Sequence, residues 1–565
     1  MNPSLEKLRD LVVAPGHITL EDFNRVVTES EAEHKTVAEV LVEKDLIGDS
    51  QLGKLLAETS GWRFLDLARV EIDEKVLHLI PELVARKREV VALDREGGGI
   101  RLGLTNPADL EIIDFLERRL GEKVIPYYLT ARGLSEAISH YRGSLKSEFD
   151  SVVAKLKPTS EHIDRDARSD LTIHLVDLLL QYGYQNKASD IHIEPYKEKV
   201  LVRFRIDGVM HDVLEVPKTL SEVIITRIKI LAKMRTDEHR AAQDGKLQFS
   251  VADGAVDVRV SILPVTEGEN VVLRLLSEQS RRFGLADLGL GEADLGRVKK
   301  AIGHPHGMIL VTGPTGSGKT TTVYAVLKIL NTRDVHIATI EDPVEYDVEG
   351  ISQIQVNPKT NLTFASGLRA IVRQDPDIIV VGEIRDPETA GIAVNSAMTG
   401  HLVLTTLHAN DAATTMPRLL DMGIEPFLVA STVNVVIAQR LVRHICDRCR
   451  VSAPPSAEEK RILAAEPGLK QVFKAQGYPT LTRLTFYRGK GCESCGRTGY
   501  RGRIGIFEVM EMNENLKHLV VQRSSSNDLT AIACKAGMTT MLEDGIAKVL
   551  AGQTTLEEVL RVTKI

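Results

Sequence analysis

One short segment has the residues of a phosphate-binding loop. "ILVTGPTGSGKTTTVYAVL", residues 309–327, passes from an apolar strand through glycines into a helix and satisfies the pattern G-x-x-x-x-G-K-[ST]. In such loops backbone N–H groups and the helix N-terminus surround phosphate, the lysine reaches the β- and γ-phosphates, and the threonine hydroxyl binds Mg²⁺. The flanking strand and helix favour this reading over a plain structural turn. We therefore predict an ATP- and Mg²⁺-binding loop made of Gly313, Pro314, Thr315, Gly316, Ser317, Gly318, Lys319 and Thr320.

Acidic residues follow two other apolar strands. "DIIVVGEIRD" places Glu383 after its apolar run, and "ATIEDPVEY" places Glu341, Asp342 and Glu345 after another. Open α/β sheets carry their functional groups at the carboxyl ends of strands. We predict that Glu383 completes the Mg²⁺ shell and that Glu341 activates the attacking water as general base. The sequence alone does not separate Glu341 from Asp342 in that role.

One histidine and two arginines are further candidates. His408 ends the strand in "GHLVLTTLHAND" and could contact the γ-phosphate or its water, although a lone histidine is more often structural. P-loop ATPases commonly bring arginine to the developing phosphoryl charge. Arg274 is the only charge in "VVLRLL", so burial would require an acidic partner or a ligand. Arg259 lies on the polar face of "VDVRVS". The alternative for either arginine is an ordinary ion pair.

Four of the five cysteines form two C-x-x-C pairs, "CDRC" and "CESC", made by Cys446, Cys449, Cys492 and Cys495. Four thiolates suit tetrahedral zinc, and a closed Cys₄ shell is structural rather than catalytic. The alternatives are a redox pair or free thiols, and disulfides are not expected in a cytoplasmic chain. We predict a Zn²⁺ site within an insert at residues 446–495.

The elements that position these residues change along the chain. From residue 284 the runs "MILVT", "HIATI", "DIIVV" and "LVLTTL" alternate with helical segments, which is typical of a parallel α/β sheet covered on both faces. Residues from about 500 are expected to be helical. We assign residues 284–565 to one α/β ATPase domain.

The preceding residues predict two smaller domains. Over 166–283 a helix in "VDLLLQYGYQ" precedes strands in "DIHIEP", "VLVRFRIDGVM" and "ENVVLRLL" and a hairpin around Asp253-Gly254, giving an α+β domain. Residues 146–165 are polar and predict a linker. Residues 1–145 predict helices followed by two strands around a run of three glycines.

Composition excludes several classes. The chain is 43% hydrophobic and 26% charged with a net charge of −7, which is ordinary for a globular protein and argues against a nucleic-acid binder. The start, "MNPSLEKLRDLVV", lacks the features of a signal peptide. The apolar stretch 426–438 is too short to span a bilayer and predicts a buried helix. We expect a cytoplasmic protein, without a transmembrane segment, that reaches a membrane through partners.

Taken together, these residues make the chain similar to the secretion and traffic ATPases of the type II secretion and type IV pilus assembly systems. The similarity covers about residues 170–565. It rests on segments that occur in the family's order: "ASDIHIEP", "QDGK", "VDVRVS", "GPTGSGKTTT", "IEDPVEY", "RQDPDIIVVGEIRD", "TGHLVLTTLHAND", "QRLVRHIC" and "GYRGRIGIFEV". One departure is Lys246, which stands in "RAAQDGK" where the family often has arginine.

The resemblance implies a RecA-like P-loop domain preceded by a PAS-like domain, a homo-hexameric ring, and an inner-membrane platform that adds pilin-like subunits to a fibre. It gives His408 a functional role and directs Arg259 and Arg274 at phosphate. The paired cysteines match the pilus-extension and secretion branches rather than retraction. Residues 1–145 are similar to the family's N-terminal docking domain. Some members bind cyclic di-GMP there, but Thr36, Ala38 and Asp45 replace the arginine and glycines of the motif, so we expect weak or absent binding.

Two other functions are compatible with a P-loop. A RecA-like nucleic-acid motor would be expected to carry basic and aromatic clusters, which this sequence lacks. A nucleotide-binding adaptor without turnover would not need the acids at the strand ends. Both alternatives therefore rank below a mechanochemical ATPase.

Overall fold

The computed structural model of the chain describes most of its 565 residues. The described residues are 5–14, 18–33, 36–43, 46–67, 70, 72–106, 108–131, 133–134, 137–138, 141, 151–152, 165–251, 254–276, 284–345, 347–465, 467–478, 484–492 and 495–563. Most of the predicted linker, Asp253 of the predicted turn and Asp45 lie outside them. The chain divides into two compact units. One holds Met1–Leu276, Cys446–Ser452 and Gly489–Arg501, and the other holds Ser277–Ile445, Ala453–Arg488 and Gly502–Ile565.

The N-terminal part contains two apolar clusters. Its helices and strands are α1 (Leu5–Val12), α2 (Leu20–Glu33), α3 (Val37–Glu43), α4 (Asp49–Ser60), α5 (Glu74–Leu77), α6 (Glu82–Arg88), β1 (Val90–Glu96), β2 (Gly99–Leu104), α7 (Leu110–Leu120) and β3 (Val124–Tyr128). Helices α1 to α4 share one cluster, and β1, β2, α7 and β3 belong to the other. The predicted hairpin is confirmed, because β1 and β2 pair antiparallel across Gly97 and Gly98, which both have positive φ. Strand β3 adds to it in parallel.

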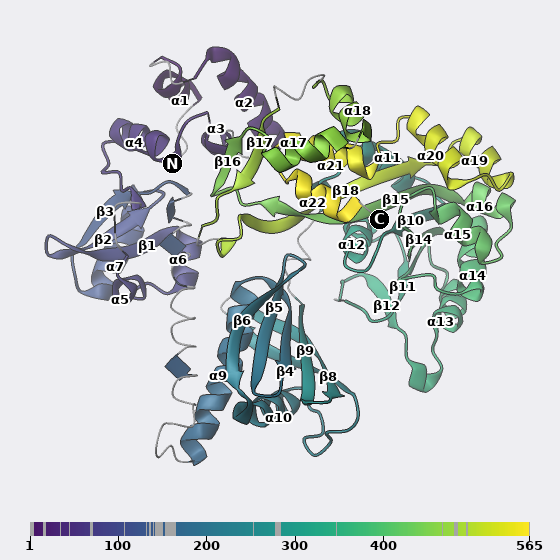
Figure 1. Ribbon diagram of the computed structural model, residues 1–565, viewed down its shortest axis with the longest axis horizontal. Helices are drawn as coiled ribbons and strands as arrows, with labels where there is room; N and C mark the ends of the chain where they lie inside the picture. The colour runs from purple at the N-terminus through teal and green to yellow at the C-terminus, as the bar shows by residue number, and fades with distance from the viewer. Residues whose placement is uncertain are drawn as a thin grey trace. The chain divides into compact units, whose positions relative to one another are not determined.

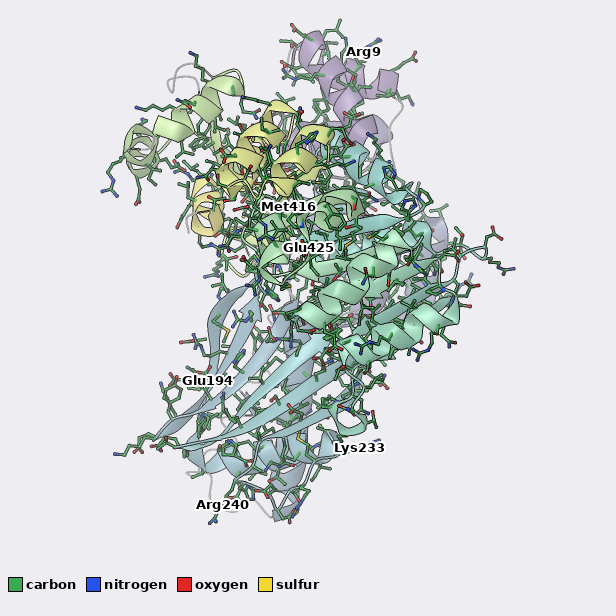
Figure 2. The ribbon with its side chains drawn as sticks, turned by 90° about the vertical axis from the view of Figure 1, so that its right-hand side faces the viewer. Arg9, Glu194, Lys233, Arg240, Met416 and Glu425 are labelled. Carbon is green, nitrogen blue, oxygen red and sulfur yellow. The ribbon has the colours of Figure 1, made fainter. Side chains whose placement is uncertain are left out.

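The next domain is a six-stranded sheet in the order β6-β5-β4-β9-β8-β7 (Figure 1). Its elements are α9 (Arg165–Gln185), β4 (Ala188–Pro195), β5 (Lys199–Ile206), β6 (Val209–Pro217), α10 (Ser221–Leu231), β7 (Gln243–Val251), β8 (Gly254–Val265) and β9 (Gly268–Leu276). In Figure 2, Glu194 marks β4 and Lys233 lies just beyond α10. Alternate residues of the strands pack with α9 and α10 in one core, so the sheet has one buried face.

One element prediction in this domain is wrong. "VLVRFRIDGVM" is two strands, β5 and β6, rather than one. Asp207 and Gly208 have φ of 50° and 85°, so they form a tight turn that reverses the chain.

The larger α/β domain contains a seven-stranded sheet in the order β12-β11-β13-β14-β10-β15-β18. The strands are β10 (Gly307–Thr312), β11 (Ile337–Glu341), β12 (Ile351–Gln355), β13 (Ile378–Val381), β14 (Leu402–Leu407), β15 (Val433–Ile445) and β18 (Tyr500–Glu511). The pairs from β12 to β15 are parallel, as predicted. Successive residues of β10 belong to two different apolar clusters, so helices cover both faces of the sheet.

Helices of this domain flank the sheet (Figure 1). They are α11 (Glu292–Ile302), α12 (Lys319–Leu330), α13 (Phe364–Ile371), α14 (Pro387–Met398), α15 (Thr415–Asp421), α16 (Pro426–Thr432), α19 (Glu514–Val521), α20 (Ser526–Lys535), α21 (Met541–Leu550) and α22 (Leu556–Thr563). The cysteine insert adds β16 (Arg450–Ala453), α17 (Ala457–Ala465), α18 (Pro467–Ala475) and β17 (Phe486–Gly489).

Two predictions for this domain need correction. The apolar stretch 426–438 is helical only to Thr432, because its β-branched second half begins β15. The chain after residue 500 continues as strand β18 before the expected helices begin. Within the described residues, no helix is both long and apolar enough to cross a bilayer.

Candidate active site

The glycine-rich loop joins the fully buried strand β10 to helix α12, which begins at Lys319. Gly313 has φ of 149°, and a Cβ there would lie 2.5 Å from the carbonyl oxygen of Gln439. Gly318 has φ of 89°. Both positions therefore need glycine, for backbone conformation and, at Gly313, for close approach as well. The loop and the start of α12 present backbone N–H groups in the arrangement that favours phosphate.

Lys319 lies over this loop. Its Nζ donates to the carbonyl oxygens of Gly313 at 2.8 Å and Pro314 at 3.1 Å. Burial lowers the pKa of Lys319, and the charge of Glu383 opposes that effect. The hydroxyl of Ser317 is buried without a hydrogen-bond partner among the described residues. A cation, an unpartnered hydroxyl and a helix N-terminus together fit a polyphosphate.

Gln439 is a site residue that motif reading missed. Its side chain is buried in β15, where Nε2 donates to Ser317 O at 2.7 Å and Oε1 accepts from Thr322 Oγ1 at 2.7 Å. It thereby ties both ends of the loop–helix junction to a neighbouring strand. A glutamine that directly follows the apolar run "VVIA" was the available signal.

Glu341 ends strand β11 in a closed hydrogen-bond network. Its carboxylate accepts from Tyr324 OH at 2.7 Å and from Thr339 Oγ1 at 2.6 Å, and Gln353 Nε2 lies 3.3 Å from the same oxygen as Thr339. Only 5% of the residue is exposed. Both oxygens are thus engaged in protein contacts, which suits a structural anchor better than a base that must meet water.

Asp342 and Glu345 follow Glu341 in the same loop. Asp342 is exposed and Glu345 is half-buried, so both have access to water. The role of Glu341 as base stays a prediction, and its surroundings favour one of these two neighbours instead.

Glu383 and His408 come together beyond the ends of β13 and β14. Nε2 of His408 lies 3.3 Å from Oε2 of Glu383, and Nη2 of Arg385 donates to Oε1 at 2.5 Å. The hydrogen bond to Glu383 raises the pKa of Arg385. A carboxylate held between two nitrogen groups at a strand end can orient a hydrated cation. Arg385 was not singled out from the sequence.

The candidate arginines lie on one row across the six-stranded sheet. Cross-strand pairing places Arg205 opposite Asp190, Asp190 opposite Arg274, and Arg274 opposite Arg259. Lys246 follows opposite Arg259. Directly opposed residues share a sheet face, so the row presents four cations and one acid on the face that does not form the core.

Arg274 has an acidic partner, which is one of the two alternatives that the sequence left open. Its Nε donates to Asp190 Oδ1 at 2.9 Å, although the side chain is 61% exposed rather than buried. Arg205 reaches the other oxygen of Asp190 at 3.5 Å. One carboxylate therefore steadies two guanidinium groups without neutralising the row. Arg205 was not singled out from the sequence, because only the cross-strand register aligns it with Asp190 and Arg274.

The four cysteines cluster as predicted. Their sulfurs all lie within 4.8 Å of one another. Cys446 and Cys492, and likewise Cys449 and Cys495, are 3.9 Å apart, and Cys492 and Cys495 are 3.7 Å apart. These distances exclude disulfides and agree with the edge of about 3.8 Å in a tetrahedron with Zn–S bonds of about 2.3 Å. The donor set fits zinc.

The thiols of the cluster differ in acidity. Burial raises the pKa of Cys446 to about 11 and also raises that of Cys449. The pKa of Cys495 is lowered. Burial alone would raise this pKa, but hydrogen bonds to the thiolate, including those from the N–H groups of Cys492 and Gly499, outweigh the effect of burial. A bound metal cation would displace the thiol protons and would be held by the four resulting thiolates.

Comparison with known proteins decides the family. The family described as type II/IV secretion system protein matches residues 166–561. The chain belongs to this secretion system protein family. Over 98% of both chains it is 38% identical to the type IV pilus assembly ATPase PilB of Myxococcus xanthus. It is 40% identical to the type II secretion system protein E of Xanthomonas campestris, over 99% of this chain and 95% of that one.

The fold of this secretion system protein also has a solved counterpart. The ATPase DotB of Legionella pneumophila superposes with a TM-score of 0.50 at 20% identity, over 69% of this chain and 95% of that one. That likeness supports the fold alone.

The N-terminal part of the secretion system protein matches a second family. The MshEN domain matches residues 60–148 and is a kind of domain that binds cyclic di-GMP. The departures at Thr36 and Ala38 lie outside this matched range. Weak or absent cyclic di-GMP binding therefore stays a prediction.

Proposed function

We propose that this protein hydrolyses ATP to drive the assembly of pilin-like subunits into a type II secretion pseudopilus or a type IV pilus. The observation that carries the proposal is similarity over nearly the whole chain to both kinds of ATPase, together with the loop at Gly313–Thr320. The protein works as a homo-hexamer on the cytoplasmic side of the inner membrane. Residues 1–145 dock it to platform proteins.

Each candidate residue takes a role in this proposal. Lys319 and the loop amides hold the phosphates. Thr320 and Glu383 hold the Mg²⁺ shell, and an acid after β11 activates water. His408 lies beside Glu383 and contacts the γ-phosphate or its water, while Arg259 and Arg274 supply positive charge to the transition state. Bound Mg²⁺ neutralises charge on the phosphates.

Zinc at the four cysteines has a structural role in the proposal. The cluster closes the insert by joining two chain segments that lie 46 residues apart. A Cys₄ shell has no open position for substrate. The ATP site and the cysteine cluster therefore have separate roles, one catalytic and one structural.

Lys319→Ala tests the proposal most directly. Removing the cation should reduce phosphate release from Mg²⁺·ATP to background, with an unchanged melting temperature, since the hydrogen bonds of Nζ within the described residues go to loop carbonyls. Lys328→Ala, on the exposed side of the same helix, is the matched control and should retain activity. A host lacking its own secretion or pilus-extension ATPase should regain assembly with the control only. Normal turnover by Lys319→Ala would refute the site.

A further inference from the structure

A buried acid in β18 has no part in the proposed mechanism. Glu508 is 5% exposed, and its Oε1 accepts the backbone N–H of Ala412 at 3.0 Å. A buried carboxylate that accepts a backbone N–H fixes that chain segment, because the N–H has no water as an alternative partner.

The segment that Glu508 holds is the loop that begins at His408. At its start, Thr312 Oγ1 donates to Leu407 O at 3.0 Å and accepts from Ala409 N at 2.9 Å. At its far end, Ala412 is held by Glu508. The loop is therefore fixed from two sides: by the strand that leads into the phosphate loop, and by β18.

Helix α21 is attached to the same strand. Asp544 accepts the N–H of Phe507 at 2.8 Å, and Lys548 Nζ donates to Gly505 O at 2.7 Å. Strand β18 therefore contacts both the His408 loop, through Glu508, and helix α21.

We propose that Glu508 is a positioning residue for ATP hydrolysis: it fixes the His408 loop to β18, the strand that also holds α21, and thereby makes turnover sensitive to the C-terminal helices. This inference rests on the proposed function. Glu508 touches no reacting atom in it and acts through the backbone of the loop.

The surroundings of Glu508 make this contact dependent on pH. Burial, with Asp411 and Glu543 as neighbouring acids and Cys534 nearby, raises the pKa of Glu508 to about 7. The ionised carboxylate accepts the Ala412 N–H with either oxygen, whereas the protonated acid can turn its own O–H toward that donor. The loop should therefore loosen, and kcat should fall, as the pH drops through about 7.

Stability should change in the opposite direction. The folded protein holds the Glu508 proton more tightly than the unfolded chain, in which the pKa of this carboxyl has its ordinary value of 4.5. This residue's contribution therefore favours folding at low pH and is lost as the pH rises from 4.5 to about 7. Activity and stability would thus respond to the same proton with opposite signs.

The test compares two buried acids of the same junction. Glu508→Gln should lower kcat roughly 10-fold, keep KM within about twofold, and remove the acidic limb of the kcat–pH profile. Asp544→Asn is the matched control. It removes one β18–α21 attachment that does not touch the His408 loop, so it should lower the melting temperature and leave the acidic limb in place.

Several outcomes would overturn the proposal. One is a Glu508→Gln enzyme that keeps wild-type kcat and its acidic limb. Another is an Asp544→Asn enzyme with the same losses, because the junction would then act only through stability.

A second measurement serves if Glu508→Gln does not fold. In the wild-type protein, exchange at the Ala412 amide, corrected for its intrinsic rate, should be faster at pH 6 than at pH 8. Equal protection would refute the contact. Wild-type protein without any ATPase activity would instead refute the proposed function, and the exchange result would still stand.

Discussion

The two sheets gather charged groups by different means. In the seven-stranded sheet, Glu341, Glu383 and His408 lie at or just beyond the ends of parallel strands, so chain topology brings them to one edge. In the six-stranded sheet, each member of the row from Arg205 to Lys246 comes from a different strand, and only cross-strand register aligns them. Short motifs reveal the first arrangement and miss the second.

The two groups also differ in their exposure. Lys319 is half-buried and already held by loop carbonyls, whereas the Arg274 side chain is 61% exposed. A charge in water contributes little until it is desolvated against a partner. If the row supplies charge to the reaction, it can do so only once a ligand covers it, whereas the groups at the strand ends already lie together.

The largest effect on turnover is expected from Arg274→Ala. If the row supplies transition-state charge, turnover should fall on the order of 10³-fold with little change in nucleotide affinity. Phosphate release and equilibrium nucleotide binding would be measured on the same preparation. Arg203→Ala is the control, because Arg203 shares the sheet face but pairs opposite His192, outside the row. Equal losses of turnover in both variants would mean that the residues of the row form only ordinary ion pairs.

A second test separates the acids after β11. Asp342→Asn or Glu345→Gln should lower kcat roughly 10²-fold or more, whichever residue is the base. Glu341→Gln should mainly lower the free energy of unfolding, by about 1–3 kcal/mol, because it disturbs a buried hydrogen-bond network. Single-turnover hydrolysis and denaturant unfolding give the two readouts. A larger kcat loss for Glu341→Gln than for its neighbours would restore Glu341 as the base.

The smallest effect on activity is expected at the cysteine cluster. Protein purified without chelators should contain about one zinc per chain, and Cys492→Ser should lose it. Proteolysis should then become faster within residues 446–495, while Mg²⁺·ATP hydrolysis changes less than in either earlier test. Metal analysis that finds no zinc in the wild-type protein would refute the predicted zinc site.

Local sequence patterns predicted much of the fold. The parallel strands β10, β11, β13 and β14 were expected because each is a short apolar run that is buried on both faces. The cysteine cluster followed from spacing alone, since two C-x-x-C pairs define a ligand set before the fold is known.

Features set by tertiary contacts were harder to predict. Asp207-Gly208 is the same turn signal that predicted the next hairpin, yet the apolar run around it was read as one strand. Residues 433–438 have no helical or strand periodicity of their own, and their place beside β10 decides that they form β15. Gln439 and Glu508 each act on segments about a hundred residues away, which no local window contains.

The bridge made by Gln439 bears on how the protein is synthesised. Its partners Thr322 and Ser317 precede it by 117 and 122 residues. A ribosome releases the whole glycine-rich motif long before the strand that braces it. During that interval the nascent chain contains the sequence of the phosphate loop but not the strand that supports it. We therefore expect the growing polypeptide to become able to bind nucleotide only late in synthesis.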